Sequence, residues 1–109
     1  MKFQHQVLAK EGWQKFSLAE QLGNVGSEVG RAIKWREKDA TLYRGAIQRA
    51  FELLDLTLRD SRWKKRLKEI ARLREVLGDA FTGGEAYKSK FEDIDRYLFQ
   101  FALAARRKC

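Results

Sequence analysis

The side chains of this sequence that could do chemistry are mostly cations. The densest cationic run is RDSRWKKRLKEIARLR, residues 59–74, in which the acidic side chains are Asp60 and Glu69. Lysine and arginine neutralise phosphate groups, and such contacts give salt-sensitive binding that does not depend on base sequence. A second cationic run, residues 106–108, lies at the end of the sequence. The two runs predict a polyanion-binding surface, and the competing interpretation is an ordinary solvated helix face.

The candidate phosphate contacts are cations on the outer edges of the expected third helix and at the end of the sequence. They are Arg62, Lys64, Lys65, Arg66, Lys68, Arg72, Arg106, Arg107 and Lys108. A weaker third group lies in residues 31–38, and the three groups would form one electropositive patch if the fold brings them to one side. Trp35 and Trp63 adjoin these groups. They could stack on unpaired bases, although burial is the commoner role of tryptophan.

Few residues of this sequence are suited to catalysis or to metal binding. The sequence has one histidine, His5, and one cysteine, Cys109, at opposite ends. Nucleophilic catalysis needs a nucleophile, a base and an orienting group in contact, and zinc needs several cysteine or histidine ligands. We therefore expect no catalytic residue, no metal and no cofactor, and we expect a protein that is not an enzyme. Carboxylate chemistry by residues such as Glu20 and Glu28 is the alternative, but solvated or ion-paired carboxylates are far commoner.

Small residues recur on one side of the segment that contains three glycines. They are Ala19, Gly23, Gly26 and Gly30, at steps of 4, 3 and 4. Each helical glycine costs roughly 0.8–1 kcal/mol relative to alanine, so we interpret the stripe as a surface for close helix packing. It could also make room for a large aromatic side chain such as Phe51, Trp63, Phe99 or Phe101. A phosphate-binding loop is the alternative, but the spacing matches neither the P-loop nor the dinucleotide pattern.

The spacing of apolar residues predicts the helices that carry these features. From Leu18 to Ala32 the apolar residues step by 4, 3, 4 and 3, which places them on one face of a helix. Ser17 and Glu20 predict a capping box at its start, and the helix is expected to run to about Lys38. A second helix is expected over residues 39–59, capped by Asp39 or Thr41.

Two further helices follow in the same way. The third is expected to begin near Asp60 or Ser61 and to end at the glycines after Phe81. Its apolar side contains Trp63, Leu67, Ile70, Leu73, Leu77 and Phe81. A second capping box, Ser89 with Glu92, predicts the start of the fourth helix.

Four helices of similar length with short connections predict an all-α fold, an up-and-down antiparallel four-helix bundle. We assign residues 17–109 to the bundle domain and residues 1–16 to a short N-terminal extension. The extension is expected either to form a short helix or to be a tail pinned by Trp13 and Phe16.

The fourth helix also predicts self-association. Its segment YLFQFALAA, residues 97–105, is apolar nearly all round, and a helix of that kind is either central or at an interface. The candidate interface residues are Tyr97, Phe99 and Leu103. We therefore expect a homo-oligomer, which is usually symmetric.

Composition sets the remaining expectations. The chain has 109 residues and a formal net charge of +8, which favours an anionic partner such as nucleic acid or an acidic protein. One cysteine cannot form an intrachain disulfide, which fits a reducing cytosol. The first residues lack the long apolar segment of a secretory signal, and no run is long enough to span a membrane. We predict a cytoplasmic protein without membrane contact.

Residues 13–35, WQKFSLAEQLGNVGSEVGRAIKW, resemble the opening of short uncharacterised bacterial four-helix proteins through W-x-K-F-S-L-x-E-Q-L-x-N. In size, charge and expected architecture, residues 17–106 are also similar to a family of four-helix bundles. It includes the accessory variability determinant of diversity-generating retroelements and the proteins encoded in ribosomal RNA intervening sequences. The resemblance implies a basic oligomer without catalytic residues that binds a reverse transcriptase and nucleic acid. It transfers no site residue.

Two hypotheses for function follow. The first is a non-enzymatic accessory protein that binds RNA or DNA through phosphate contacts and assists a nucleic-acid-processing enzyme. The second is a protein-interaction or scaffolding module whose small-residue stripe or fourth helix docks a protein partner, with the charge serving solubility. Binding of nucleic acid at low salt would separate the two.

Overall fold

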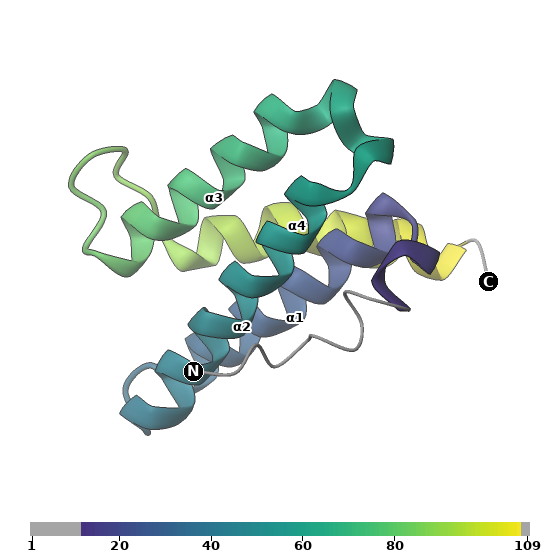
Figure 1. Ribbon diagram of the computed structural model, residues 1–109. Coiled ribbons are helices and arrows are strands. Elements are labelled where there is room, and N and C mark those ends of the chain that lie inside the picture. Colours follow the sequence, from purple (N-terminus) through teal and green to yellow (C-terminus); the bar gives the residue numbers. More distant parts are fainter. Residues whose placement is uncertain (1–11, 108–109) are drawn as a thin grey trace.

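The computed structural model describes residues 12–107, and within this range the chain is an all-α four-helix bundle without strands. The helices are α1 (Leu18–Trp35), α2 (Ala40–Arg59), α3 (Leu67–Phe81) and α4 (Phe91–Arg107). Two short 3-10 helices, η2 (Trp13–Lys15) and η3 (Ser61–Arg66), precede α1 and α3 (Figure 1). The fold class predicted from apolar spacing is confirmed.

Helix α1 is the central element, because it packs extensively against both α2 and α4. Its predicted apolar face, from Leu18 to Ala32, is buried throughout. The capping box at its start is present, with the Ser17 N–H donating to Glu20 Oε1 at 2.8 Å and the Glu20 N–H donating to Ser17 Oγ at 3.1 Å. Asp39 caps α2 by accepting from the Leu42 N–H at 3.0 Å. Local capping residues therefore define where each of the two helices of the α1–α2 hairpin begins.

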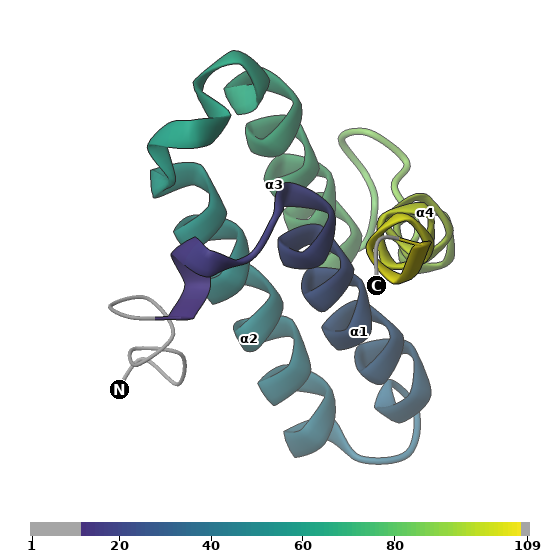
Figure 2. The same ribbon diagram turned by 90° about the vertical axis from the view of Figure 1, so that its right-hand side faces the viewer.

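The other two helices pack differently from each other. Figure 2 shows α4 almost end on while α1, α2 and α3 lie across the view, so α4 crosses its neighbours at a marked angle. Helix α3 contacts α2 and α4 much less extensively than α1 contacts its two partners. The core therefore lies mainly between α1, α2 and α4, and α3 closes one side of it.

The predicted start of the third helix is wrong. A continuous helix from Asp60 or Ser61 was expected, but residues 61–66 form the 3-10 segment η3, and Trp63 has non-helical backbone angles of φ −102° and ψ 23°. The Asp60 carboxylate caps this segment by accepting from the Arg62 N–H at 3.1 Å, and Trp63 Nε1 donates to Gln21 Oε1 of α1 at 3.0 Å. The apolar stripe is correspondingly shorter: Ile70, Leu73 and Leu77 are buried, whereas Leu67 and Phe81 are exposed.

The predicted cap of the fourth helix is also wrong. Helix α4 begins at Phe91, and the side chains of Ser89 and Glu92 do not form a capping box. The Ser89 N–H donates to Asp79 Oδ2 at 3.0 Å, and Glu92 Oε2 accepts from Arg36 Nη2 at 2.6 Å. The buried Asp79 carboxylate also accepts from the Ala86 and Tyr87 N–H groups, so it organises the whole connection between α3 and α4.

The described part of the N-terminal extension belongs to the core. Trp13 is 2% exposed and packs edge to face against Phe16, with ring centroids 5.6 Å apart. Of the two expectations for the extension, residues 12–16 therefore match the pinned tail. His5 and the short helix considered for the first residues lie outside the described residues, as do Lys108 and Cys109.

Candidate nucleic-acid interface

A buried polar network supports the basic segment η3. Gln21 is 0% exposed, and its side chain bridges three elements. Its Nε2 donates to the Trp13 carbonyl at 2.9 Å and to Asp60 Oδ2 at 3.1 Å. Its Oε1 accepts from Trp63 Nε1 at 3.0 Å. We call Trp13, Gln21, Asp60, Arg62 and Trp63 the anchoring network, because it ties η2, α1 and η3 together.

Arg62 is the last member of the anchoring network, and its guanidinium group is engaged there in hydrogen bonds. Its guanidinium donates to Asp60 Oδ2 at 2.6 Å and to the Phe16 carbonyl at 2.8 Å. The same group lies over the Trp63 ring, 4.4 Å from the centroid. The hydrogen bonds from Arg62 hold the pKa of the Asp60 carboxyl below its ordinary value. Arg62 is therefore a structural clamp, and Trp63 has one ring face covered and its N–H satisfied.

The sequence alone did not identify Gln21 as part of a site. It carried one indication, since Gln21 lies between Leu18 and Val25 on the buried face of α1. A polar side chain in that position requires a hydrogen-bonding partner. Its partner Asp60 is 39 residues away in the sequence, so pattern counting could not pair them.

The predicted phosphate contacts separate into engaged and free cations. Arg66 pairs with Glu69 at 2.7 Å, and Arg72 lies 4.4 Å from the centroid of the Tyr87 ring. Lys64, Lys65 and Lys68 are exposed, and no carboxylate within residues 12–107 forms an ion pair with any of them. Among the predicted contacts between residues 62 and 72, the three lysines are therefore the cations with neither an ion pair nor a ring contact.

Several basic segments lie toward one end of the molecule. Residues 13–15, the end of α2 with η3, and the last turn of α4 are all at the right-hand side of Figure 1, and Figure 2 looks onto that side. Trp13 and Gln14 share a surface depression with Arg59, which confirms that η2 and the end of α2 adjoin. The exposed cations here that form no ion pair within residues 12–107 are Lys15, Arg59, Lys64, Lys65, Lys68, Arg106 and Arg107, and we call them the basic end.

The expected convergence of all three basic groups is wrong. Helix α1 runs away from the basic end, so residues 31–38 lie at the opposite end of the molecule (Figure 1). There Arg36 pairs with Glu92 at 2.6 Å and Arg31 pairs with Glu28 at 2.8 Å. Trp35, which follows Lys34, is at that end too, and Lys34 lies over its ring.

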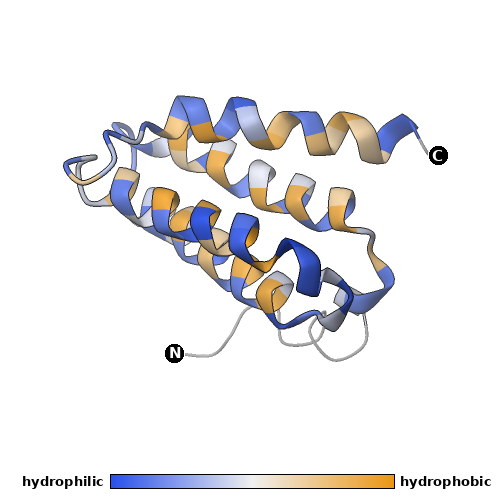
Figure 3. Cartoon of the chain, turned by 90° about the horizontal axis from the view of Figure 1, so that it is seen from above, coloured by the Kyte–Doolittle hydropathy of each residue, from blue (hydrophilic) through white to orange (hydrophobic). Residues whose placement is uncertain are grey.

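The last turn of α4 contributes to the basic end from the other side. Arg106 and Arg107 are exposed, and Figure 3 shows this turn as a hydrophilic patch at the end of a helix whose middle is largely apolar. Lys108 was predicted with them and lies outside the described residues.

The predicted interface residues of the fourth helix are on different sides of it. Tyr97 faces α3, where its hydroxyl donates to Glu69 Oε2 at 2.7 Å. Burial and this hydrogen bond raise the pKa of Tyr97 to about 12. Phe99 is 53% exposed and faces a groove beside α1, and Leu103 is half-buried. The three residues therefore do not form one surface.

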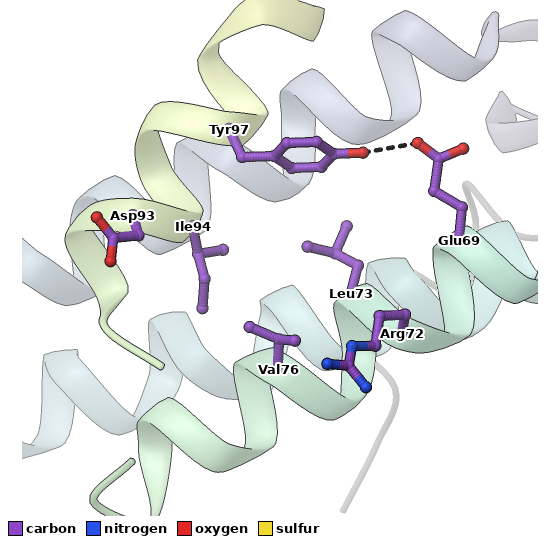
Figure 4. Close-up of a pocket in the computed structure, with 7 residues that line it drawn as sticks. All are labelled: Glu69, Arg72, Leu73, Val76, Asp93, Ile94 and Tyr97. Atoms are coloured by element: carbon purple, nitrogen blue, oxygen red, sulfur yellow. Dashed lines mark hydrogen bonds between the residues drawn. The ribbon is translucent and has the colours of Figure 1, made fainter. Parts of the chain in front are cut away.

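A cleft of about 340 Å³ separates α3 from α4. Figure 4 shows that Leu73 and Val76 of α3 face Ile94 and Tyr97 of α4 across it. Glu69, Arg72 and Asp93 form its rim. The walls are apolar and the rim charges are partly engaged, so the cleft suits an apolar group better than a phosphate.

The small-residue stripe lies along the contact between α1 and α4. A Cβ atom added at Gly26 would be 3.0 Å from Leu98 Cβ, and one added at Gly23 would be 3.2 Å from the Ala102 Cα. At Gly30 the nearest atom is Asp95 Oδ1, at 3.6 Å. The stripe thus brings two helices close together, and none of the aromatic side chains considered for it is among the nearest atoms.

Other site types find no support in residues 12–107. No group of three or more histidine, cysteine, aspartate or glutamate side chains there is placed to hold a metal ion. Within the same range, no helix has the length and apolarity needed to cross a membrane.

Comparison with known proteins leaves the geometry as the basis for a functional argument. Helical bundles of this kind support many unrelated functions, so the fold alone does not identify one. No protein-family model, curated protein or solved structure gave a significant match to the chain.

Proposed function

We propose that this protein binds nucleic acid through phosphate contacts at its basic end. In this proposal it is a non-enzymatic, cytosolic accessory factor for a reverse transcriptase or another enzyme that processes RNA or DNA. The resemblance of its size, charge and architecture to the retroelement accessory proteins is consistent with that role. Base-specific recognition is not part of the proposal, because no polar group at the basic end is fixed in a geometry that reads base edges.

One observation carries the proposal. Lys64, Lys65 and Lys68 are exposed cations without carboxylate partners among the described residues, whereas Arg62 and Arg66 beside them are paired. Exposed lysines close together repel one another, and neutralisation by phosphates with release of counterions relieves that repulsion. The chain thus uses its arginines here for structure and leaves its lysines available.

The anchoring network makes this surface a defined one. Because Asp60 and Trp63 are fixed by Gln21, the backbone that carries Lys64 and Lys65 is held against α1 and η2. A held backbone loses less conformational entropy when its side chains bind than a free loop would.

The test is the salt dependence of oligonucleotide binding. Fluorescence anisotropy with labelled, mixed-sequence RNA and DNA would be measured for the wild type and for Lys64→Gln/Lys65→Gln/Lys68→Gln between about 50 and 200 mM salt. We expect the triple variant to bind more weakly to every sequence. Its slope of log affinity against log salt should be shallower by about 2–3, since each lost phosphate contact removes about 0.7–0.9.

A matched control removes the same charge elsewhere. Lys38, Lys88 and Lys90 are exposed and lie in the connections at the opposite end of the molecule. The variant Lys38→Gln/Lys88→Gln/Lys90→Gln should keep a slope close to that of the wild type. Equal losses in the two triple variants would mean that only net charge matters, and would contradict a defined site.

The cleft between α3 and α4 favours a second candidate function, a protein-interaction module. Its volume of about 340 Å³ and its apolar walls are within the range in which pockets accept an apolar group. In this alternative, the folded protein would bind neither RNA nor DNA even at about 50 mM salt, where phosphate contacts are strongest. The anisotropy measurement on the wild type therefore separates the two functions.

A further inference from the structure

One flank of α4 carries an exposed aromatic side chain. Phe99 is 53% exposed, the highest value for a large hydrophobic side chain within residues 12–107. It lines a groove of about 250 Å³ between α4 and α1, whose floor includes Gly23, Gly26 and Gly30. In Figure 2, α4 lies at the edge of the molecule with α1 on one side only.

The α4 side chains that line this groove are spaced symmetrically along the helix, with an acidic residue at one end and a basic residue at the other. They are Asp95, Phe99, Ala102 and Arg106, at steps of 4, 3 and 4. At 100° per residue, all four lie within about 60° of one another around the helix axis. The midpoint of the set lies between Phe99 and Ala102. If a second copy of the helix is turned end for end about that midpoint, its Asp95 lies opposite Arg106 and its Phe99 lies opposite Ala102.

The two charges at the ends of this pattern are not engaged in the described chain. No ion pair joins Asp95 or Arg106 to another side chain of residues 12–107, although six of the nine arginines between residues 31 and 74 are paired. Opposite charges at the two ends of one apolar stripe are complementary to a second, antiparallel copy of the same stripe. In a parallel arrangement, like charges would meet instead.

We infer that this flank of α4 is the contact surface for a second copy of the chain. The two α4 helices lie antiparallel across a two-fold axis, with Asp95 facing the partner subunit's Arg106 at both ends. In this arrangement Phe99 packs over the partner subunit's Ala102. The contact is isologous, so it closes after two copies and forms no filament. Arg106, which also belongs to the basic end, is engaged in this contact, whereas the inference uses none of Lys64, Lys65 and Lys68.

The size of the contact sets its expected strength. One pair of crossing helices gives an interface at the small end of the range for specific complexes. We expect a dissociation constant on the order of micromolar, with Phe99 as the central anchor and the two ion pairs fixing the orientation. Sedimentation velocity of nuclease-treated protein over a range of concentrations would measure it.

Charge exchange tests the orientation directly. Asp95→Arg alone places two cations at each end of the contact, and Arg106→Asp alone places two anions there. Each should raise the dimer dissociation constant by tenfold or more, because facing like charges are strongly unfavourable. The double variant Asp95→Arg/Arg106→Asp restores both pairs, with their polarity reversed, and should dimerise within about threefold of the wild type.

Mixing the two single variants gives a second, independent readout. Asp95→Arg protein has a wholly basic stripe and Arg106→Asp protein a wholly acidic one, so a mixture should form heterodimers that neither protein forms alone. Gln100 is exposed on another side of α4, and Gln100→Arg and Gln100→Asp are the matched controls that should not change dimerisation. Circular dichroism would verify that every variant keeps its helix content.

Three results would overturn the inference. They are a wild-type protein that stays monomeric up to millimolar concentration, single variants that dimerise like the wild type, and a double variant no better than the singles. None of these results bears on Lys64, Lys65 or Lys68, so nucleic-acid binding would be judged separately.

Discussion

The side chain of Gln21 shows how one buried amide can position a distant surface. It satisfies the Trp13 carbonyl, the Asp60 carboxylate and the Trp63 indole at once. A buried amide whose donor and acceptor atoms both have partners favours a single arrangement of the groups around it. The orientation of the basic segment η3 therefore depends on a residue of α1 that never reaches the surface.

Asp60 gives this network a pH dependence. Asp60→Asn should lower the free energy of unfolding by about 1–3 kcal/mol at pH 7, because it removes charge-assisted hydrogen bonds from Arg62. The pKa of the Asp60 carboxyl is lowered in the folded state by Arg62. Its stabilisation is thus present above its unfolded value of about 3.9 and is lost as the pH falls through the folded value. Urea unfolding should show the difference in stability between the wild type and the variant shrinking as the pH is lowered below about 4.

Asp93→Asn is the control for this experiment. Asp93 pairs with Arg96 one turn away, and both side chains are largely exposed. Such pairs contribute about 0–1 kcal/mol, so the variant should be nearly as stable as the wild type at every pH. A difference for Asp60→Asn that persisted undiminished in acid would show that the amide disturbs packing and that the carboxylate charge is not the cause.

At the scale of helices, periodicity predicted which faces are buried. The face of α1 and the middle of α3 are as expected, because their apolar residues recur at helical spacing. The break at η3 was not predictable in the same way. The residues of η3 favour helix by composition, and its 3-10 turn results from a partner in α1 that is distant in sequence.

The predicted capping box at the start of α4 was wrong for a related reason. A serine followed by glutamate three residues later is a good local indication of a capping box. Here Asp79 and Arg36 bind the same two residues from other elements. Tertiary contacts therefore prevailed over a local capping motif. The basic end was also only partly predictable, because the sequence does not show which cations form ion pairs.

The close contact of α1 with α4 predicts opposite effects for two glycine substitutions. Gly26→Ala adds a methyl group 3.0 Å from Leu98 Cβ. Overpacking of about 1–3 kcal/mol should exceed the gain of about 1 kcal/mol in helix propensity. Gly78→Ala meets only Phe51 Cζ at 3.9 Å and should stabilise by about 0.5–1 kcal/mol. Thermal unfolding of both variants would measure these effects, and two changes of the same sign would contradict this account.

At the scale of the whole molecule, a residue that precedes the first long helix packs into the core. Trp13 is buried and contributes both a ring and a carbonyl to the bundle. Trp13→Ala should lower the free energy of unfolding by about 3–5 kcal/mol. Trp13→Phe should cost clearly less, because the buried Trp13 Nε1 has no hydrogen-bond partner that phenylalanine would remove. Chemical denaturation would rank the variants, and equal losses would show that a smaller ring recovers none of the contribution of the indole, which would contradict this account.

The light packing of α3 has a consequence for motion. Elements with few tertiary contacts open at lower free energy than the global unfolding of a domain. Amide exchange should therefore be faster in α3 than in α1, even though both are regular helices. Since Lys68 lies in the first turn of α3 and η3 leads into it, a bound polyanion would slow exchange most in the least protected helix. Ligand binding would then reduce the local opening of α3, with no change of fold.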